Sequence, residues 1–167
     1  MSAPSIRIAR HEDLPRIVEI YNASVPGRLA TADLKPVSVE SREFWFSAHD
    51  PAKHPLTVAV VENGAIAGWG SLNAFYGRIA YQHTVEISIY VAPEFSRRGI
   101  GGLLTDDMLK RCPALKIKTV LAYIFAHNEP SVQLFKKRGF VLWGHLPRIA
   151  DMDGIERDLD IYGLRIT

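Results

Sequence analysis

The sequence has little cysteine and no long apolar run, and each absence excludes a class of protein. Its single cysteine, Cys112, excludes an intramolecular disulfide and a cysteine-rich zinc site. No apolar run reaches the roughly 18 residues that a membrane-spanning helix requires. The first 14 residues contain no apolar segment of the kind found in secretory signal peptides. We therefore expect a cytoplasmic protein without membrane partners.

The composition indicates one ordinary globular domain. Domains average about 150 residues, so the 167-residue chain predicts a single domain over residues 1–167. Apolar residues make up 47% and charged residues 23% of the chain, unlike a disordered sequence. The net charge is only +2, but residues 95–150 carry ten Lys or Arg against three acids. This asymmetry favours an anionic ligand on one side of the fold, and a solvated helix face is the alternative.

Hydrophobic periodicity predicts interleaved strands and helices of an α/β (α+β) fold. We expect strands over residues 5–9, 56–61, 65–74, 83–91, 119–125, 140–146 and 155–166. We expect helices over residues 14–21, 38–45, 99–112 and 130–138. The turn signal Glu62-Asn63-Gly64 lies between two strands and requires them to pair antiparallel. Strict strand–helix alternation is missing, which predicts a mixed sheet covered by helices.

The strand at 83–91 places a carboxylate in an unusual position. Its odd-numbered residues from Val85 to Val91 are all apolar and share one face, while Glu86 lies on the other face. A carboxylate among apolar neighbours is unfavourable unless a function requires it. The alternative is a strand whose second face is open to water.

A glycine-rich segment follows this strand and opens the next helix. Arg97-Arg98-Gly99-Ile100-Gly101-Gly102 combines backbone N–H groups, a helix N-terminus and two cations, which together favour phosphate or pyrophosphate. It is not a Walker A loop, because no Gly-Lys-Ser/Thr follows, and it is not the dinucleotide fingerprint G-x-G-x-x-G, because position 104 is Leu. No second RGG follows and no aromatic residues are interleaved, so nucleic acid is not expected as a partner. Further on, Asn128 is either a helix N-cap or an amide that meets a ligand.

Together these motifs resemble the GNAT superfamily of acetyl-CoA-dependent N-acetyltransferases, and more narrowly its phosphinothricin acetyltransferase subgroup. The resemblance covers nearly the whole chain and rests on the following segments: Ile20-Tyr21-Asn22, Gly77-Arg78-x-Ala80-Tyr81, Thr84 to Val91, Arg97 to Gly102, Asn128-x-Pro130-Ser131 and Arg138-Gly139-Phe140. It implies a single-domain fold with a mixed, mostly antiparallel twisted sheet of about six to seven strands flanked by about four helices. It also implies a homodimer, a small-molecule amine as substrate, acetyl-CoA as co-substrate and no metal.

The resemblance assigns roles to individual residues. It implies that acetyl-CoA is bound by Ile89, Tyr90, Val91, Arg97, Arg98, Gly99, Ile100, Gly101, Gly102, Asn128, Ser131 and Lys137. It implies that the acceptor is bound by Phe75, Tyr76, Gly77, Arg78, Tyr81, Glu86, Ile87 and Ser88. Glu86 is the expected catalytic base, taking a proton from the acceptor ammonium. Arg78 either binds an acceptor carboxylate bidentately or braces its loop.

Two positions depart from the superfamily pattern. Ser96 stands where Gln or Arg is usual, and Arg97 or Arg98 is expected to compensate. Phe135 stands where many members have a tyrosine that protonates the leaving thiolate. Tyr90, Tyr123, His127 or a water molecule is left for that task. The expected activity is acetyl transfer to a small amino acid or an analogue resembling phosphinothricin or methionine sulfoximine, by direct attack in a ternary complex. The alternatives are a catalytically weak acyl-CoA-binding regulatory or sensor module and a peptide N-terminal acetyltransferase.

Overall fold

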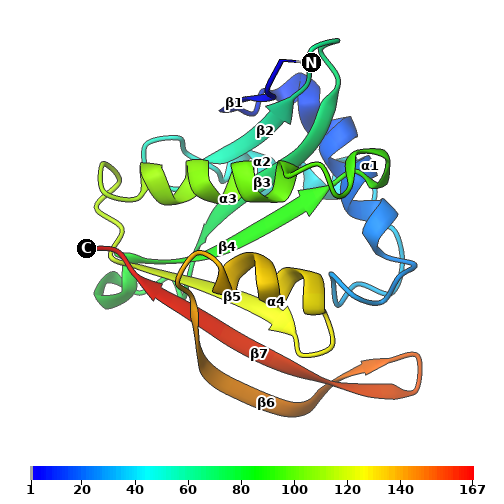
Figure 1. The fold of residues 1–167 in the computed structure, drawn as a ribbon, viewed down its shortest axis with the longest axis vertical. Coiled ribbons are helices and arrows are strands. Elements are labelled where there is room, and N and C mark those ends of the chain that lie inside the picture. Colours follow the sequence, from blue (N-terminus) through cyan, green and yellow to red (C-terminus); the bar gives the residue numbers. More distant parts are fainter. Residues whose placement is uncertain (1) are drawn as a thin grey trace.

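The computed structural model describes residues 2–167, which form one seven-stranded sheet with helices on both faces (Figure 1). The strands run in the order β1-β2-β3-β4-β5-β7-β6, and every neighbouring pair is antiparallel except β4 and β5. The strands are β1 (Ser5–Ile8), β2 (Leu56–Val60), β3 (Ile66–Ala74), β4 (Thr84–Val91), β5 (Thr119–Phe125), β6 (Val141–Met152) and β7 (Ile155–Arg165). The α-helices are α1 (Leu14–Ser24), α2 (Glu43–Ser47), α3 (Ile100–Arg111) and α4 (Glu129–Lys136). This architecture confirms the predicted fold class.

Each face of the sheet carries its own apolar core. Helices α3 and α4 cross the front face in Figure 1. There Met108 of α3 and Phe135 of α4 join Val85 and Ile87 of β4 in one buried cluster. Ile17 of α1 belongs to a second buried cluster, with side chains of β2 and β3. No helix of residues 2–167 has the length and apolarity needed to cross a membrane.

Strand β4 shows the predicted alternation. Val85 and Ile87 are buried in the front core at 0% and 4% exposure, whereas Glu86 and Ser88 are half-buried on the opposite face. The apolar face therefore anchors the strand, and the polar face is left for chemistry.

The last strands differ from the prediction at one boundary. Strand β6 continues past the predicted end at residue 146 to Met152, with an irregular register between Leu146 and Ala150. It joins β7 through Asp153 and Gly154, which both have positive φ, at 59° and 85°. Asp-Gly is a favoured pair for a two-residue hairpin because both central residues tolerate that conformation. The predicted break at residue 146 was wrong, although the Asp-Gly pair was a sequence signal for the longer hairpin.

The parallel pair β4–β5 separates in mid-strand. Its register runs from Thr84 opposite Thr119 to Glu86 opposite Leu121, and in the described chain it goes no further. Beyond this point β4 continues for five residues and β5 for four, without pairing to each other. The separation leaves backbone N–H and C=O groups of both strands needing partners.

Candidate active site

A cavity of about 370 Å³ fills the space where β4 and β5 separate. From β4 and β5 it is lined by Glu86, Ile87, Ser88, Ile89, Tyr90, Ala122, Tyr123, Ile124 and Phe125. From the other elements it is lined by Leu29, Ala30, Thr31, Ala32, Asn128, Ser131, Phe135 and Leu159. Seven of the predicted site residues thus meet around one cavity: Glu86, Ile87, Ser88, Ile89, Tyr90, Asn128 and Ser131.

Glu86 lies at the inner end of this cavity, at the last β4–β5 pair. Burial raises the pKa of its carboxyl above the ordinary value. Desolvation disfavours the charged form, and no cation is in contact to offset it in the described structure. A carboxylate with a raised pKa holds a proton more tightly, which makes Glu86 a better general base than a free glutamate.

A second, smaller cavity of about 140 Å³ adjoins the first and shares Ser88 and Tyr90 with it. Its lining residues are Ile17, Val18, Tyr21, Val37, Arg42, Trp45, Trp69, Ser71, Asn73, Ser88 and Tyr90. Asn73 is the cross-strand partner of Glu86, so Glu86, which lines the larger cavity, neighbours a residue of the smaller one. The side chain of Asn73 has two polar partners. Its amide oxygen Oδ1 lies 3.0 Å from Nε2 of His49, and its Nδ2 donates to Oγ of Ser71.

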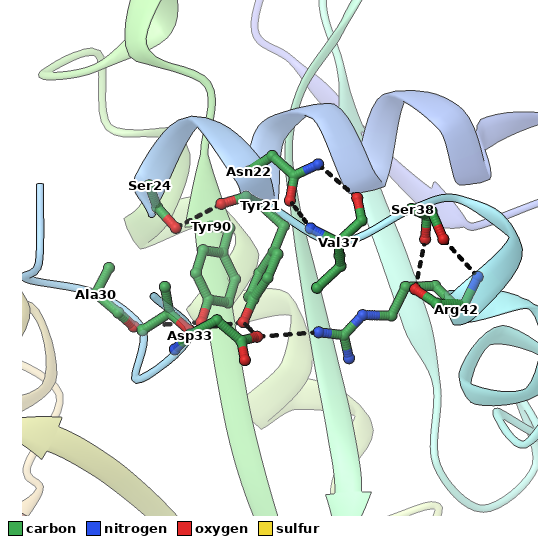
Figure 2. Close-up of polar contacts among 11 residues, drawn as sticks. Tyr21, Asn22, Ser24, Ala30, Asp33, Val37, Ser38, Arg42 and Tyr90 are labelled. Carbon is green, nitrogen blue, oxygen red and sulfur yellow. Dashed lines mark hydrogen bonds and ion pairs between the residues drawn. The ribbon is translucent and has the colours of Figure 1, made fainter. Parts of the chain in front are cut away.

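The segment between α1 and α2 folds over both cavities as a lid, defined here as residues 25–42. Asn22 fastens it to α1 by two hydrogen bonds with the backbone of Val37, at 2.8 and 2.9 Å (Figure 2). Tyr90 donates from its hydroxyl to the carbonyl of Ala30 at 3.3 Å. Arg28 forms an ion pair with Asp153 of the β6–β7 turn at 2.5 Å. These contacts tie the lid to α1, to β4 and to the β6–β7 turn.

The predicted anion-binding segment has the backbone expected of a cradle. Arg97 and Gly99 both have positive φ, 61° and 79°, and Gly99 is the N-cap of α3. The first N–H groups of a helix have no partner within it, so Ile100, Gly101 and Gly102 each offer one donor. Arg98 lies over the ring of Phe95, 5.4 Å from its centroid. Both arginines of the segment are exposed.

Three further predicted residues lie on or beside α4. Asn128 is 6% exposed and caps the helix, because its Oδ1 accepts from the Ser131 N–H at 3.4 Å. Its Nδ2 donates to the Leu29 carbonyl at 3.2 Å, which also fastens the lid. The predicted N-cap is thus observed, and Asn128 and Ser131 line the larger cavity as well. Lys137 is exposed at the other end of α4, where it is the C-cap.

Four residues of the predicted acceptor loop line a different cavity from Glu86. Phe75, Gly77, Arg78 and Tyr81 line a third cavity of about 530 Å³ whose walls include neither Glu86 nor Ser88. Three aromatic side chains of this loop, those of Phe75, Tyr76 and Tyr81, contact one another with ring centroids 5.5 to 5.9 Å apart. This part of the predicted acceptor site therefore lines a different cavity from Glu86, and its role in acceptor binding stays a prediction.

The candidate proton donors occupy different environments. Tyr123 lines the larger cavity, and burial together with the Glu86 carboxylate raises its pKa. Tyr90 stacks on Trp69, its hydroxyl is bound to Ala30, and burial raises its pKa. His127 is held by the Arg28 carbonyl at 3.2 Å. Phe135 is buried at 5% exposure and closes the cavity as an apolar wall.

Sequence reasoning missed the lid contacts and the aromatic wall of the smaller cavity. Arg42, Trp45 and Trp69 were not candidates, although each lines that cavity. One signal was available: Arg42 and Trp45 are three residues apart in a predicted helix, so they share a face. Among residues 2–167 there is no cluster of three or more side chains suited to a metal ion.

Comparisons with known proteins agree with this geometry. The chain is 45% identical over 163 residues to "Putative phosphinothricin acetyltransferase YwnH" of Bacillus subtilis (strain 168), covering 98% of this chain and 99% of that protein. It is 31% identical over 166 residues to an L-methionine sulfoximine/L-methionine sulfone acetyltransferase of Pseudomonas paraeruginosa, covering 99% and 96%. A phosphinothricin acetyltransferase from Sinorhizobium meliloti, solved in complex with AcCoA, superposes with a TM-score of 0.93 at 32% identity, over 99% of this chain and 89% of that one.

The family comparison is equally direct. Residues 14–140 match the model of the acetyltransferase (GNAT) family. This range contains the separated strands and the lid, which line the two adjoining cavities, and also the glycine-rich segment. The chain therefore belongs to the GNAT family of acetyltransferases.

Proposed function

We propose that this enzyme transfers the acetyl group of acetyl-CoA to the amine of a small amino acid or amino-acid analogue, within a ternary complex. The observation that carries the proposal is that Glu86 lines the cavity in the strand separation and is paired across the strands with Asn73, which lines a second, adjoining cavity under the lid. The larger is suited to a linear arm that passes between strands, and the smaller to a compact acceptor. The relatives named for phosphinothricin and methionine sulfoximine support an acceptor of this size.

Acetyl-CoA supplies an acetyl group already activated as a thioester. The residues present fit such a ligand. On the side that faces β5, the backbone of β4 from Ile89 to Val91 is not paired to another strand in the described chain, and it offers hydrogen bonds to an amide-containing arm. The N–H groups that open α3 and the cations Arg97 and Arg98 offer a binding site for pyrophosphate. Asn128, Ser131 and Lys137 complete the proposed binding set.

In this proposal Glu86 takes the proton that the acceptor ammonium must lose. Its raised pKa brings it closer to the pKa that general-base catalysis near neutrality favours. The developing charge on the thioester oxygen is stabilised by a backbone N–H of Ile89 or Tyr90. Holding both reactants in these adjoining cavities contributes through proximity and orientation.

Tyr123 is the proposed proton donor to the departing sulfur. It lines the larger cavity near Glu86, whereas the Tyr90 hydroxyl is already bound to a lid carbonyl. A thiol has an ordinary pKa near 8.5, so the thiolate leaves readily and the donor adds only part of the rate. We expect Tyr123→Phe to lower kcat by roughly tenfold, with acetyl-CoA affinity unchanged by calorimetry. Tyr90→Phe is the matched control, and an equal or larger loss of kcat there would transfer the role to Tyr90.

The activity is tested by the release of free thiol from acetyl-CoA in the presence of an acceptor panel. The panel contains phosphinothricin, L-methionine sulfoximine, L-methionine sulfone, the protein amino acids and a short peptide with a free N-terminus. We expect release with free amino acids or their analogues and little with the peptide. Release with the peptide alone would indicate a peptide N-terminal acetyltransferase. Binding of acetyl-CoA without release for any acceptor would indicate an acyl-CoA-binding module.

A homodimer is part of the proposal. Three consecutive large apolar side chains of β6, Val141, Leu142 and Trp143, are 47% to 55% exposed on a strand at the sheet edge. Large exposed apolar side chains on an edge strand favour a protein interface. We expect light scattering to give about twice the monomer mass of 18.7 kDa and Trp143→Glu to give the monomer mass. A monomeric parent protein would contradict the dimer.

A further inference from the structure

Arg138 joins the two helices that lie on the front face of the sheet in Figure 1. It follows α4, and its guanidinium forms an ion pair with Asp106 of α3, from Nε to Oδ1 at 2.7 Å and from Nη2 to Oδ2 at 3.3 Å. The Arg138 side chain is only 19% exposed, so the cation is largely shielded from solvent. The motif Arg138-Gly139-Phe140 has no part in the proposed acetyl transfer.

The same guanidinium lies against the first turn of α3. A Cβ added to Gly102 would lie 2.5 Å from Nη2 of Arg138, so the arginine occupies the space that a side chain at position 102 would need. Gly102 carries the third of the N–H groups that open α3. Asp106 is the first acidic residue of this helix and lies one turn further along the same face. Arg138 therefore places a positive charge beside the proposed phosphate donors and pairs with the carboxylate that follows them.

Arg138 also caps the last turn of α4. Its backbone N–H donates to the Phe135 carbonyl, and Nη1 of its side chain donates to the Leu134 carbonyl at 2.9 Å. The last carbonyls of a helix lack partners within it and carry the negative end of its dipole. One guanidinium thus neutralises two negative groups beside the start of α3, which are a carboxylate and a helix end.

The charges around the start of α3 determine how well it binds an anion. The opening N–H groups favour an anion, whereas an unpaired carboxylate one turn away would disfavour it. A guanidinium has five N–H groups. Asp106 and Leu134 use three of those on Arg138, so within residues 2–167 one N–H on each Nη is left. Arg138 can therefore offset the carboxylate and still offer charged donors to a phosphate.

We propose that Arg138 is a positioning residue for the pyrophosphate of acetyl-CoA. By pairing with Asp106 and the Leu134 carbonyl, it keeps the opening turn of α3 favourable for the negative charges of the phosphates. The lack of a side chain at Gly102 leaves room for this guanidinium. The inference rests on the proposed acetyl-CoA binding, and it adds to it a residue from outside the proposed binding set.

The experiment measures acetyl-CoA affinity by calorimetry in the parent, Arg138→Gln, Asp106→Asn and the double variant. For Arg138→Gln we expect affinity to fall about three- to tenfold, because an unpaired carboxylate then lies one turn from the phosphates. For Asp106→Asn we expect affinity to rise about twofold or more, because the carboxylate is removed and the positive charge stays. The double variant restores the balance of charge and should bind acetyl-CoA about as well as the parent.

A brace that merely holds the two helices together gives a different order of affinities. Either single substitution would then break the bridge and weaken binding, and the double variant would bind no better than Arg138→Gln. An affinity of Asp106→Asn as low as that of Arg138→Gln would therefore overturn the proposal. Arg111→Gln is the matched control, because Arg111 pairs with Asp107 at 2.6 Å at the other end of α3. Its acetyl-CoA affinity should equal that of the parent.

A second measurement uses an acetyl donor without phosphates. S-acetylpantetheine has the thioester and the amide-containing arm of acetyl-CoA but lacks the pyrophosphate and the nucleotide. In the thiol-release assay, Arg138→Gln should lower kcat/KM for acetyl-CoA about three- to tenfold and change that for S-acetylpantetheine by less than about twofold. An equal loss with both donors would indicate damage to the whole site and would overturn the proposal.

Asp106→Asn provides the answer if Arg138→Gln does not give the parental circular dichroism spectrum. The charge explanation predicts tighter acetyl-CoA binding in this variant, and the brace explanation predicts weaker binding. The failure of the proposed function looks different, because then the parent protein binds no acetyl-CoA. A parent that binds acetyl-CoA with an affinity that a folded Arg138→Gln retains defeats this inference alone.

Discussion

Replacing Glu86 with glutamine is expected to lower kcat by about a hundredfold or more at neutral pH. The substitution keeps the size of the side chain and removes its ability to accept the acceptor's proton. Glu86 lies at the inner end of the strand separation, where burial raises its pKa. Acetyl-CoA affinity measured by calorimetry should stay close to the parent value, because the proposed cofactor contacts come from other residues.

The role of Glu86 as a base also predicts how activity changes with pH. A base must be deprotonated to act, so kcat/KM of the parent enzyme should fall as the pH drops through the pKa of Glu86. Because burial raises that pKa, the fall begins at a higher pH than for a free glutamate. In Glu86→Gln this limb should be absent, and the deficit should shrink at high pH, where free amine is abundant. Glu156→Gln, at an exposed position on β7, is the matched control. A deficit in Glu86→Gln that is equal at every pH would indicate a binding or structural role.

Replacing Gly101 with valine is expected to abolish measurable acetyl-CoA binding while the protein remains folded. A Cβ at Gly101 would lie 3.6 Å from Val91 Cγ2 and 3.7 Å from Leu134 Cδ2, which is ordinary contact, so the helix itself accommodates the change. The added methyl groups would enter the space where α3 begins beside the strand separation. That space is the proposed path of the cofactor to the N–H groups of α3.

Gly101 is a cleaner test than its neighbours. Gly99 has φ of +79°, so a β-branched residue there strains the backbone whatever space is available. A Cβ at Gly102 would lie 2.5 Å from Nη2 of Arg138, whose ion pair with Asp106 joins α4 to α3. Gly144→Val is the matched control, because its Cβ would make an equally ordinary contact of 3.5 Å on β6. Calorimetry should detect parental acetyl-CoA affinity in the control and none in Gly101→Val. Parental affinity in a folded Gly101→Val would remove the basis for placing the cofactor here.

Local patterns in the sequence predicted most of the fold. The alternation of β4 predicted which side chains are buried, and the structure places Val85 and Ile87 in the core and Glu86 outside it. The predicted strand at 119–125 matches β5 at both ends. The predicted end of β6 was wrong, because strand propensity did not reveal that the strand continues past Pro147 through an irregular register.

The amino-acid sequence alone determined the fold class, the family resemblance and the position of Glu86 on the polar face of its strand. These follow from periods of two and 3.6 residues and from short motifs, which are properties of neighbouring residues. Only the tertiary structure decided that β4 and β5 part after the Glu86–Leu121 pair, and that the lid folds over the two cavities beside that point. Strand separation and lid placement depend on contacts between residues far apart in the chain. The lid is held in place by three such contacts, Asn22 with Val37, Tyr21 with Asp33 and Tyr90 with Ala30. No local periodicity of the sequence encodes which of these partners meet.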